Sequence, residues 1–189
     1  MTLPFVAKLM RILLFHKPKK AVVSTRDEQG RRTVFDLLPA WARNEGWMPV
    51  GRLDRDSRGL LLFVQDGRLL DRLTQPGAYE KTYEVWVRGH LQEKQLPFLL
   101  EGIPSPVGLL RCVSVKIRGY VGPKTRLEVT LDEGKNREIR RLFAAFKDES
   151  SGTSLKVLDL KRIAFGGVTL DVPSGQWRFL TDDELQRLK

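Results

Sequence analysis

The sequence predicts an α+β fold with a bent, mainly antiparallel or mixed central sheet flanked by helices. Two observations support this fold class. Segments with apolar residues at alternate positions, typical of half-buried strands, occur in both halves of the chain, and segments with apolar residues at helical spacing separate them. No linker rich in Pro, Gly or Ser divides the chain, so we expect residues 1–189 to form one domain of two closely joined halves.

The first quarter of the chain predicts short elements. Residues 11–15 and 16–25 are typical of two strands around a Lys-Pro turn, and residues 28–39 of a turn followed by one short helix. Lys8 and Arg11 interrupt the apolar N-terminal residues and no small-residue cleavage site follows, so we expect no signal peptide. No apolar run approaches the length needed to span a membrane.

A buried strand and a capped helix come next. Residues 60–64 form an uninterrupted apolar run, which predicts a strand buried on both faces. Asp66 can cap the following helix, in which three leucines share one face and which ends at a Pro-Gly pair.

The middle of the chain predicts one strand and one interrupted helix. Residues 81–89 alternate, with Tyr83 and two valines on one face of the expected strand and Trp86 on the other. Residues 91–102 indicate a helix with a break near its proline, and residues 102–108 a loop.

An arginine-rich helix follows the next expected strand. Residues 125–131 predict a strand and residues 136–146, after a short turn, a helix with one apolar stripe. At 100° per residue, Arg137 and Arg141 lie opposite this stripe, whereas Arg140 lies at its edge. An arginine at the border between core and solvent can extend into a cleft.

The C-terminal segment completes the expected sheet. Residues 155–160 and 168–172 are typical of strands. Thr181 and Glu184 have the spacing of a capping box, which predicts a terminal helix over residues 181–189.

The overall charge favours a polyanionic partner. The 189 residues, 41% of them apolar, include 33 Lys and Arg against 23 Asp and Glu, which gives a formal net charge of +10. A balance this basic points first to nucleic acid and second to an anionic membrane surface.

Cysteine and histidine usage restricts the chemistry. The single cysteine, Cys112, excludes an internal disulfide and a cysteine-based zinc cluster, and His16 and His90 are isolated from other soft ligands. We therefore expect a reducing, cytoplasmic setting and a buried structural thiol.

One charged stretch stands out because it adjoins the buried strand. Asp54, Arg55, Asp56 and Arg58 directly precede the apolar run of residues 60–64. Taken singly, these charges are typical of a salt-bridged turn, as the helix arginines are of a solvated face. In combination, a carboxylate, an aromatic strand and an arginine-rich helix can supply the nucleophile or base, the stacking surface and the phosphate contacts of a nucleic-acid site.

Three segments in this order resemble the motifs of pseudouridine synthases. GRLDRDSRGLLL resembles the motif with the catalytic aspartate, KTYEVWVRG the second motif, and EGKNREIRRLFAA the third motif in its RsuA-type branch. The likeness extends to FHKPKKAVVST and LKVLDLKRIAFGGVTL, so it covers most of the chain. It implies the catalytic fold of that family, and the chain is most similar to members that lack an N-terminal S4 RNA-binding domain.

The resemblance implies three catalytic residues. It assigns the nucleophile to Asp54, base stacking and a part in proton transfer to Tyr83, and pairing with the aspartate to Arg140. Leu160 matches an apolar position beneath the site. A core tyrosine with a satisfied hydroxyl and a plain core leucine are the structural alternatives.

Five basic residues are the candidates for RNA contacts. Arg137 and Glu138 replace a frequent His-Gln pair of the family motif, so phosphate contact and a solvated surface position both remain open for Arg137. We expect Asp56 to be a loop carboxylate paired with Arg58 or Arg52. The RNA-binding candidates are Arg52, Arg55, Lys135, Arg137 and Arg141.

The implied reaction is the isomerisation of uridine to pseudouridine within RNA, for which ribosomal RNA, and its large subunit in particular, is the expected partner. An isomerisation of this kind needs no metal and no cofactor, and we expect a monomer that acts without a membrane. Two alternatives use the same residues. One is a noncatalytic RNA-binding or ribosome-assembly protein, and the other a magnesium-dependent nuclease built on Asp54 and Asp56.

Overall fold

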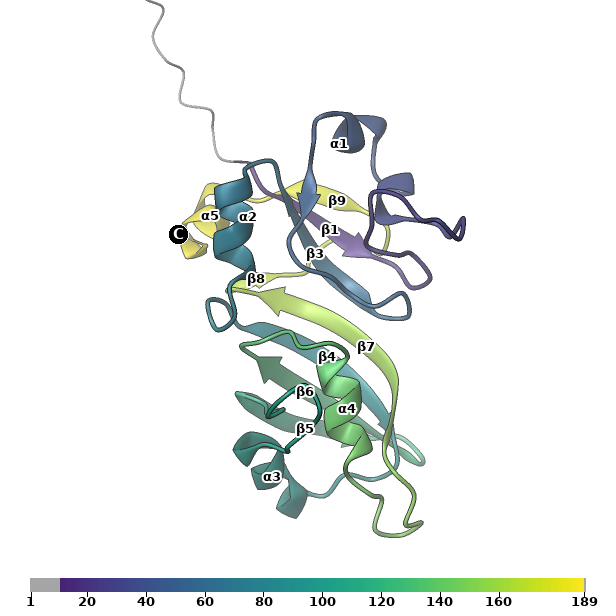
Figure 1. The fold of residues 1–189 in the computed structure, drawn as a ribbon. Coiled ribbons are helices and arrows are strands. Elements are labelled where there is room, and N and C mark those ends of the chain that lie inside the picture. The colour runs from purple at the N-terminus through teal and green to yellow at the C-terminus, as the bar shows by residue number, and fades with distance from the viewer. Residues whose placement is uncertain (1–10, 189) are drawn as a thin grey trace, which may run out of the picture.

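The computed structural model describes residues 11–188, which form one continuous mixed sheet of nine strands with helices on its faces (Figure 1). Seven strands follow the order β5-β6-β4-β7-β3-β1-β9, while β2 pairs with β3 and β8 with β7. The strands are β1 (Leu13–Lys17), β2 (Met48–Pro49), β3 (Arg58–Val64), β4 (Lys81–Arg88), β5 (Ser114–Tyr120), β6 (Lys124–Leu131), β7 (Lys156–Phe165), β8 (Val168–Thr169) and β9 (Trp177–Phe179). All pairings are antiparallel except that of β3 with β7, so the predicted α+β class with a mainly antiparallel sheet is confirmed.

Five α-helices and two short 3₁₀ helices connect the strands of this described region. They are η1 (Val34–Asp36), α1 (Ala40–Asn44), α2 (Gly67–Thr74), η2 (Glu93–Gln95), α3 (Leu96–Glu101), α4 (Glu138–Ala144) and α5 (Asp182–Arg187). None of the helices in residues 11–188 is long and apolar enough to cross a membrane.

Strand β3 is covered on both faces. Leu60, Leu62 and Val64 pack with buried side chains of α2 on one face, and Leu61 and Phe63 contribute to a second cluster on the other. The second cluster is aromatic-rich and includes residues of β1, η1 and α1. The side chains of the strand therefore alternate between two cores, which explains why a continuous apolar run forms it.

The C-terminal half has its own core between the sheet and α4. Apolar side chains of β4, β6 and β7 share one face of the sheet, and the stripe predicted for α4 packs against them. The stripe residues Ile139, Leu142 and Phe143 are at most 3% exposed. Figure 1 shows α4 lying across this part of the sheet, with the long, curved β7 between the two halves.

The two halves meet where β3 runs parallel to β7. Their register pairs are Arg58 with Lys161 and Gly59 with Arg162. Gly59 has a φ of +115°, and a Cβ atom at this position would overlap the backbone of Arg162. Only glycine combines this backbone angle with so close an approach of two strands.

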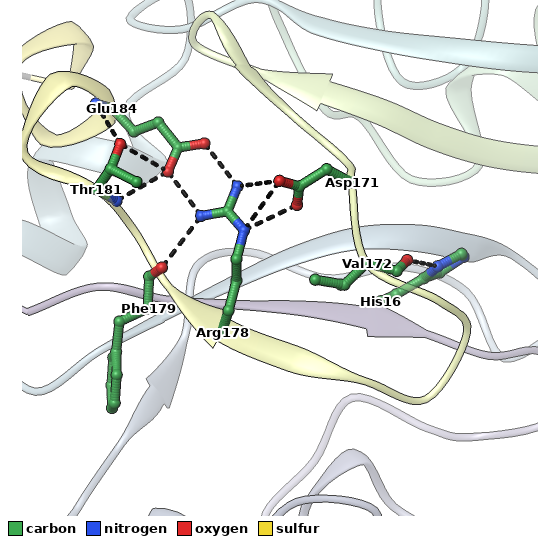
Figure 2. A network of polar contacts seen from close by, with 7 residues as sticks. All are labelled: His16, Asp171, Val172, Arg178, Phe179, Thr181 and Glu184. Carbon is green, nitrogen blue, oxygen red and sulfur yellow. Dashed lines mark hydrogen bonds and ion pairs between the residues drawn. The ribbon is translucent and has the colours of Figure 1, made fainter.

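Two ion-pair groups support this architecture. At the joint, Asp159 of β7 pairs with Arg58 of β3 and with Lys19. At the C-terminal end, the Arg178 guanidinium bonds Asp171, Glu184 and the carbonyl of Phe179, as Figure 2 shows. This second group connects β9 to α5.

The hydrogen bonds to Arg178 lower the pKa of the Glu184 carboxyl. The same Glu184 accepts the Thr181 backbone N–H at 2.9 Å, so the capping box predicted for the terminal helix is confirmed (Figure 2).

Most predicted elements are present, with several differences. Residues 16–25 do not form a second strand, because after β1 only Val22 makes an isolated bridge, to Thr33. Pro97 does not break a helix but occupies the first turn of α3, where its missing N–H needs no partner. The interpretation of the N-terminal residues 1–10 lies outside the described residues. The strands β2, β5 and β9 and the helix α1 were not predicted.

Candidate active site

The carboxylate of Asp54 extends from a short loop directly before β3. The loop is closed by a hydrogen bond from the Ser57 backbone N–H to the Asp54 carbonyl, at 3.0 Å. Strand β1 also supports the loop. Its last residue, the buried Lys17, donates to the carbonyls of Asp54 (3.1 Å) and Ser57 (2.8 Å). The loop backbone is therefore held from two sides while its aspartate side chain stays one-third exposed.

The ammonium group of Lys17 is unusual because its side chain has no measurable exposure. Burial lowers its pKa to about 8, although the nearby carboxylates of Asp54 and Asp56 favour the charged form. In that form, Lys17 supplies charge-assisted hydrogen bonds to carbonyl oxygens that would otherwise need water.

Two arginines of the α4 region face the Asp54 carboxylate. The Arg140 Nε atom lies 3.6 Å and the Arg137 Nη1 atom 3.5 Å from Asp54 Oδ2. Arg140 also donates from Nη1 to the Val157 carbonyl at 3.1 Å, which orients its guanidinium, and its Nε makes no hydrogen bond in the described structure. Both distances are those of ion pairs that are longer than hydrogen bonds.

The backbone explains why both arginines reach the same carboxylate. Arg137 adopts a left-handed conformation with φ of +53° and ends the turn that precedes α4. The buried Glu138 stabilises this turn by accepting the Lys135 N–H at 3.0 Å, and burial raises the pKa of Glu138. A left-handed non-glycine residue is uncommon and frequently occurs at functional sites.

Tyr83 and Leu160 form the apolar side of the site. Tyr83 lies on β4, and both side chains are 7% exposed. Its register partner on β7 is Arg162, and the next pair on the same face is Val85 with Leu160. The sheet thus presents a tyrosine and a leucine beside the Asp54 loop.

These side chains line one cavity of about 90 Å³, the Asp54 cavity. It lies between the loop before β3, the β4–β7 face and the start of α4. Its lining residues are Arg52, Leu53, Asp54, Ser57, Tyr83, Leu131, Gly134, Lys135, Arg137, Glu138, Ile139, Arg140 and Leu160. Seven of the nine residues expected from the sequence therefore meet in one place.

Two of the expected residues lie outside this cavity. Arg55 is exposed and pairs with Asp56 at 3.6 Å, and Arg141 is exposed and donates to the Asn136 side chain at 3.3 Å. The expected pairing of Asp56 with Arg58 or Arg52 is wrong, because Arg58 pairs with Asp159 at the joint of the sheet. Asp56 is nevertheless a loop carboxylate, with 73% of its side chain exposed.

Sequence reasoning missed two residues of the site. Lys17 follows three apolar residues and a histidine on β1, and fully buried lysines are rare, so its place at the end of a strand does not predict its burial. Ser57 lines the cavity with a buried hydroxyl that has no hydrogen-bond partner within the described chain. The only sequence signal for Ser57 is its position in the charged loop before β3.

The arrangement can perform chemistry that depends on one positioned carboxylate. Asp54 lies on a loop held by backbone hydrogen bonds and faces two guanidinium groups, and Tyr83 lines the same cavity. This arrangement suits a carboxylate that acts as nucleophile or general base on a planar heterocycle. Within residues 11–188, no three His, Cys, Asp or Glu side chains are grouped so that they could hold a metal ion.

Sequence comparisons identify similar proteins. The family model described as RNA pseudouridylate synthase matches residues 11–145. Two proteins named ribosomal large subunit pseudouridine synthase B are similar to most of the chain. The one from Vibrio cholerae is 38% identical over 184 residues and the one from Haemophilus influenzae 37% over 185, in each case over 96% of this chain. The chain spans only 55% and 50% of these two relatives.

Solved structures show the same fold. A crystal structure of a pseudouridylate synthase superposes with a TM-score of 0.77 at 28% identity, over 95% of this chain and 74% of the other. The archaeal box H/ACA Nop10-Cbf5 complex contains a chain with a TM-score of 0.57 at 15% identity, over 82% of this chain and 47% of that one, which is a likeness of fold alone.

Proposed function

The chain belongs to the RNA pseudouridylate synthase family, and from this premise we propose that it isomerises a specific uridine to pseudouridine within an RNA chain. In this reaction the bond between C1′ of the ribose and N1 of uracil breaks, the base turns, and C5 of uracil bonds to C1′. The proton on C5 is lost and N1 gains one, so nothing is oxidised or hydrolysed overall.

The observation that supports this proposal best is the meeting of three distant segments at the Asp54 cavity. Asp54, Tyr83 and Arg140 come from a loop, a strand and a helix, and all three line this cavity, where Arg140 forms an ion pair with Asp54. In the proposal, Asp54 is the catalytic carboxylate and Tyr83 stacks on the target base. Arg140 orients the carboxylate and offsets the cost of its partial burial.

Arg137 has a contact that favours a role near the reaction. Its guanidinium lies as close to Asp54 as that of Arg140, but half of its side chain is exposed. It can therefore contact both the carboxylate and an RNA phosphate at the cavity mouth. Arg52 and Lys135 line the cavity beside it, and we assign RNA contacts to these three. Arg55 and Arg141, which are exposed outside the cavity, are proposed as further contacts.

The target nucleotide must leave its stack to reach this cavity. A base paired within a helix presents only its edges, whereas the Asp54 carboxylate has to reach the ribose or the ring atoms of uracil. The small cavity with one aromatic wall and a cationic rim suits an extruded pyrimidine.

We propose large-subunit ribosomal RNA as the substrate, which the names of the relatives support. The relatives reported above are named synthase B. Within the RsuA-type branch, we further propose a likeness to large subunit pseudouridine synthase E.

The proposal includes no cofactor, a monomeric enzyme and a cytoplasmic location. The isomerisation needs no external oxidant or reductant. The cytoplasm is where bacterial ribosomal RNA is available during ribosome assembly.

The test is pseudouridine mapping of large- and small-subunit ribosomal RNA from cells that lack this protein, complemented with the wild type or with Asp54→Asn. We expect one pseudouridine to disappear and to return only with the wild type, and its position identifies the substrate. The Asp54→Asn protein should remain folded and retain much of its RNA affinity, because the loop is held by backbone contacts. Return of the pseudouridine with Asp54→Asn would remove Asp54 from the mechanism, and no change at any site would favour a noncatalytic RNA-binding protein.

A further inference from the structure

A second, larger cavity adjoins the Asp54 cavity. This Lys81 cavity has a volume of about 400 Å³ and shares four lining residues with the first, Arg52, Tyr83, Gly134 and Lys135. Tyr83 therefore borders both cavities.

Two cations lie side by side on the strands behind this cavity. Lys81 and Tyr83 share one face of β4, and their register partners on β7 are Phe165 and Arg162. The Lys81 ammonium and the Arg162 guanidinium each lie 5.7 Å from the centre of the Phe165 ring. The pair thus flanks one aromatic ring on the sheet.

Neither cation forms an ion pair with a carboxylate of the described residues. Lys81 donates to the Asp132 carbonyl at 3.1 Å, and Arg162 donates from Nε to the Leu60 carbonyl at 2.7 Å. Arg162 is only 3% exposed, and its Nη2 has no hydrogen-bond partner within residues 11–188. Glu133 is the one acidic residue among those that line the cavity, and it pairs with Lys135.

Burying the charges of Lys81 and Arg162 costs free energy when no anion lies between them. Burial lowers the pKa of Lys81 and the nearby Arg162 lowers it further, and these effects outweigh the carboxylates of Asp132, Glu138 and Glu133, which act in the opposite direction. A buried guanidinium that lacks a carboxylate partner forgoes the interactions that normally offset its desolvation. An anion placed between the two side chains would provide these interactions.

We propose that the Lys81 cavity is a subsite for the nucleotide next to the target uridine, with the phosphate of that nucleotide held by Lys81 and Arg162. This inference rests on the proposed function. An RNA chain that delivers a uridine to the Asp54 cavity continues through an adjoining phosphate and nucleotide, and the Lys81 cavity is contiguous and cationic. Its volume exceeds that of a phosphate alone, and Leu73, Pro76 and Phe165 give it an apolar wall for the sugar or base.

The experiment measures binding of four small probes by NMR titration at low salt. The probes are uridine, its 5′-monophosphate, its 3′-monophosphate and the dinucleotide UpU. They are compared on the wild type, on Lys81→Met, and on Lys116→Met as a matched control. Lys116 is an exposed lysine of β5 whose register partner is Glu128, so it lies on the opposite face of the sheet from Tyr83.

On the wild type, one of the two monophosphates and UpU should bind roughly tenfold more tightly than uridine, as a charge-assisted phosphate contact predicts. On Lys81→Met this gain should fall to about twofold while uridine binding is unchanged. Lys116→Met should behave as the wild type. Lys81→Gln, which keeps a polar side chain, replaces Lys81→Met if the latter does not fold.

Two results would overturn the subsite. One is equal affinity of uridine and both monophosphates for the wild type, and the other is a phosphate gain that persists in the Lys81 variant. Pseudouridine formation by the wild type on ribosomal RNA is measured in parallel. Isomerisation without a phosphate gain would refute the subsite alone, whereas an inactive wild type would refute the proposed function.

Discussion

Replacing Gly59 with alanine should force apart the two halves of the sheet where β3 meets β7. Gly59 has a φ of +115°, and a Cβ there would overlap the Arg162 carbonyl oxygen and come within 2.5 Å of the Arg162 nitrogen. Both neighbours are backbone atoms, so a side-chain rotation cannot relieve the overlap. Backbone strain of about 1–2 kcal/mol and overpacking of about 1–3 kcal/mol combine to an expected loss of about 3 kcal/mol in the free energy of unfolding.

The assay is thermal and urea unfolding of Gly59→Ala beside the wild type. A loss of about 3 kcal/mol corresponds to a melting temperature lower by about 6–12 °C for a domain of this size. Gly30→Ala is the matched control, because Gly30 also has a positive φ, +66°, but no atom lies within 4 Å of the position that the new methyl group would take. The control should lose only about 1 kcal/mol, which is the strain without the overlap.

The comparison of the two variants decides the reasoning. Equal losses in the free energy of unfolding for Gly59→Ala and Gly30→Ala would show that the close approach of β3 to β7 adds no cost to a side chain at residue 59. We also expect folded Gly59→Ala to lose activity. Gly59 lies five residues after Asp54, in the strand β3 that directly follows the Asp54 loop, so a shift of this strand would move the carboxylate.

Three further predictions concern the site and the joint. Arg137→Asn, chosen because asparagine tolerates the left-handed backbone, should weaken RNA binding and reduce the slope of log affinity against log salt by about 0.7–1, and an unchanged slope would exclude a phosphate contact. Tyr83→Phe should retain base stacking, so a large fall in kcat at unchanged RNA affinity would assign a role to the hydroxyl. Burial raises the pKa of Asp159, but hydrogen bonds from Arg58 and Lys19 outweigh it and lower the pKa from 3.8 to about 2. The stabilisation is therefore present above pH 3.8 and lost as the pH falls towards 2. Over this interval the wild type should lose about 1–2 kcal/mol more than Asp159→Asn, after allowance for solvent screening, and parallel unfolding curves in acid would contradict it.

The local sequence pattern predicted the helices and strands that are stabilised by residues close to one another in the sequence. The strands β4 and β6 alternate cleanly, and α2 and α5 begin at capping residues that the structure confirms. The strands β2 and β9 consist of two and three residues, so they exist only because β3 and β1 offer them an edge. A pairing partner distant in the sequence leaves no periodic signal in so short a segment.

The candidate site likewise has residues that sequence motifs predict and contacts that only the tertiary structure produces. Motif resemblance selected Asp54, Tyr83 and Arg140, but spacing could not show that a loop, a strand and a helix converge. The second ion pair of Asp54, with Arg137, depends on one left-handed residue before α4, and no propensity rule predicts such an angle for arginine. The burial of Lys17 depends on the β3 loop folding over the end of β1, which is a tertiary contact.

The joint of β3 with β7 has a consequence for how the candidate site is assembled. Asp54 and its support Lys17 belong to the N-terminal half of the sheet, whereas Tyr83, Arg140 and Leu160 belong to the C-terminal half. Neither half alone contains all of these residues, so a nascent or cleaved chain with one folded half lacks the candidate site. The site is complete only when both cores have formed and the two strands have paired.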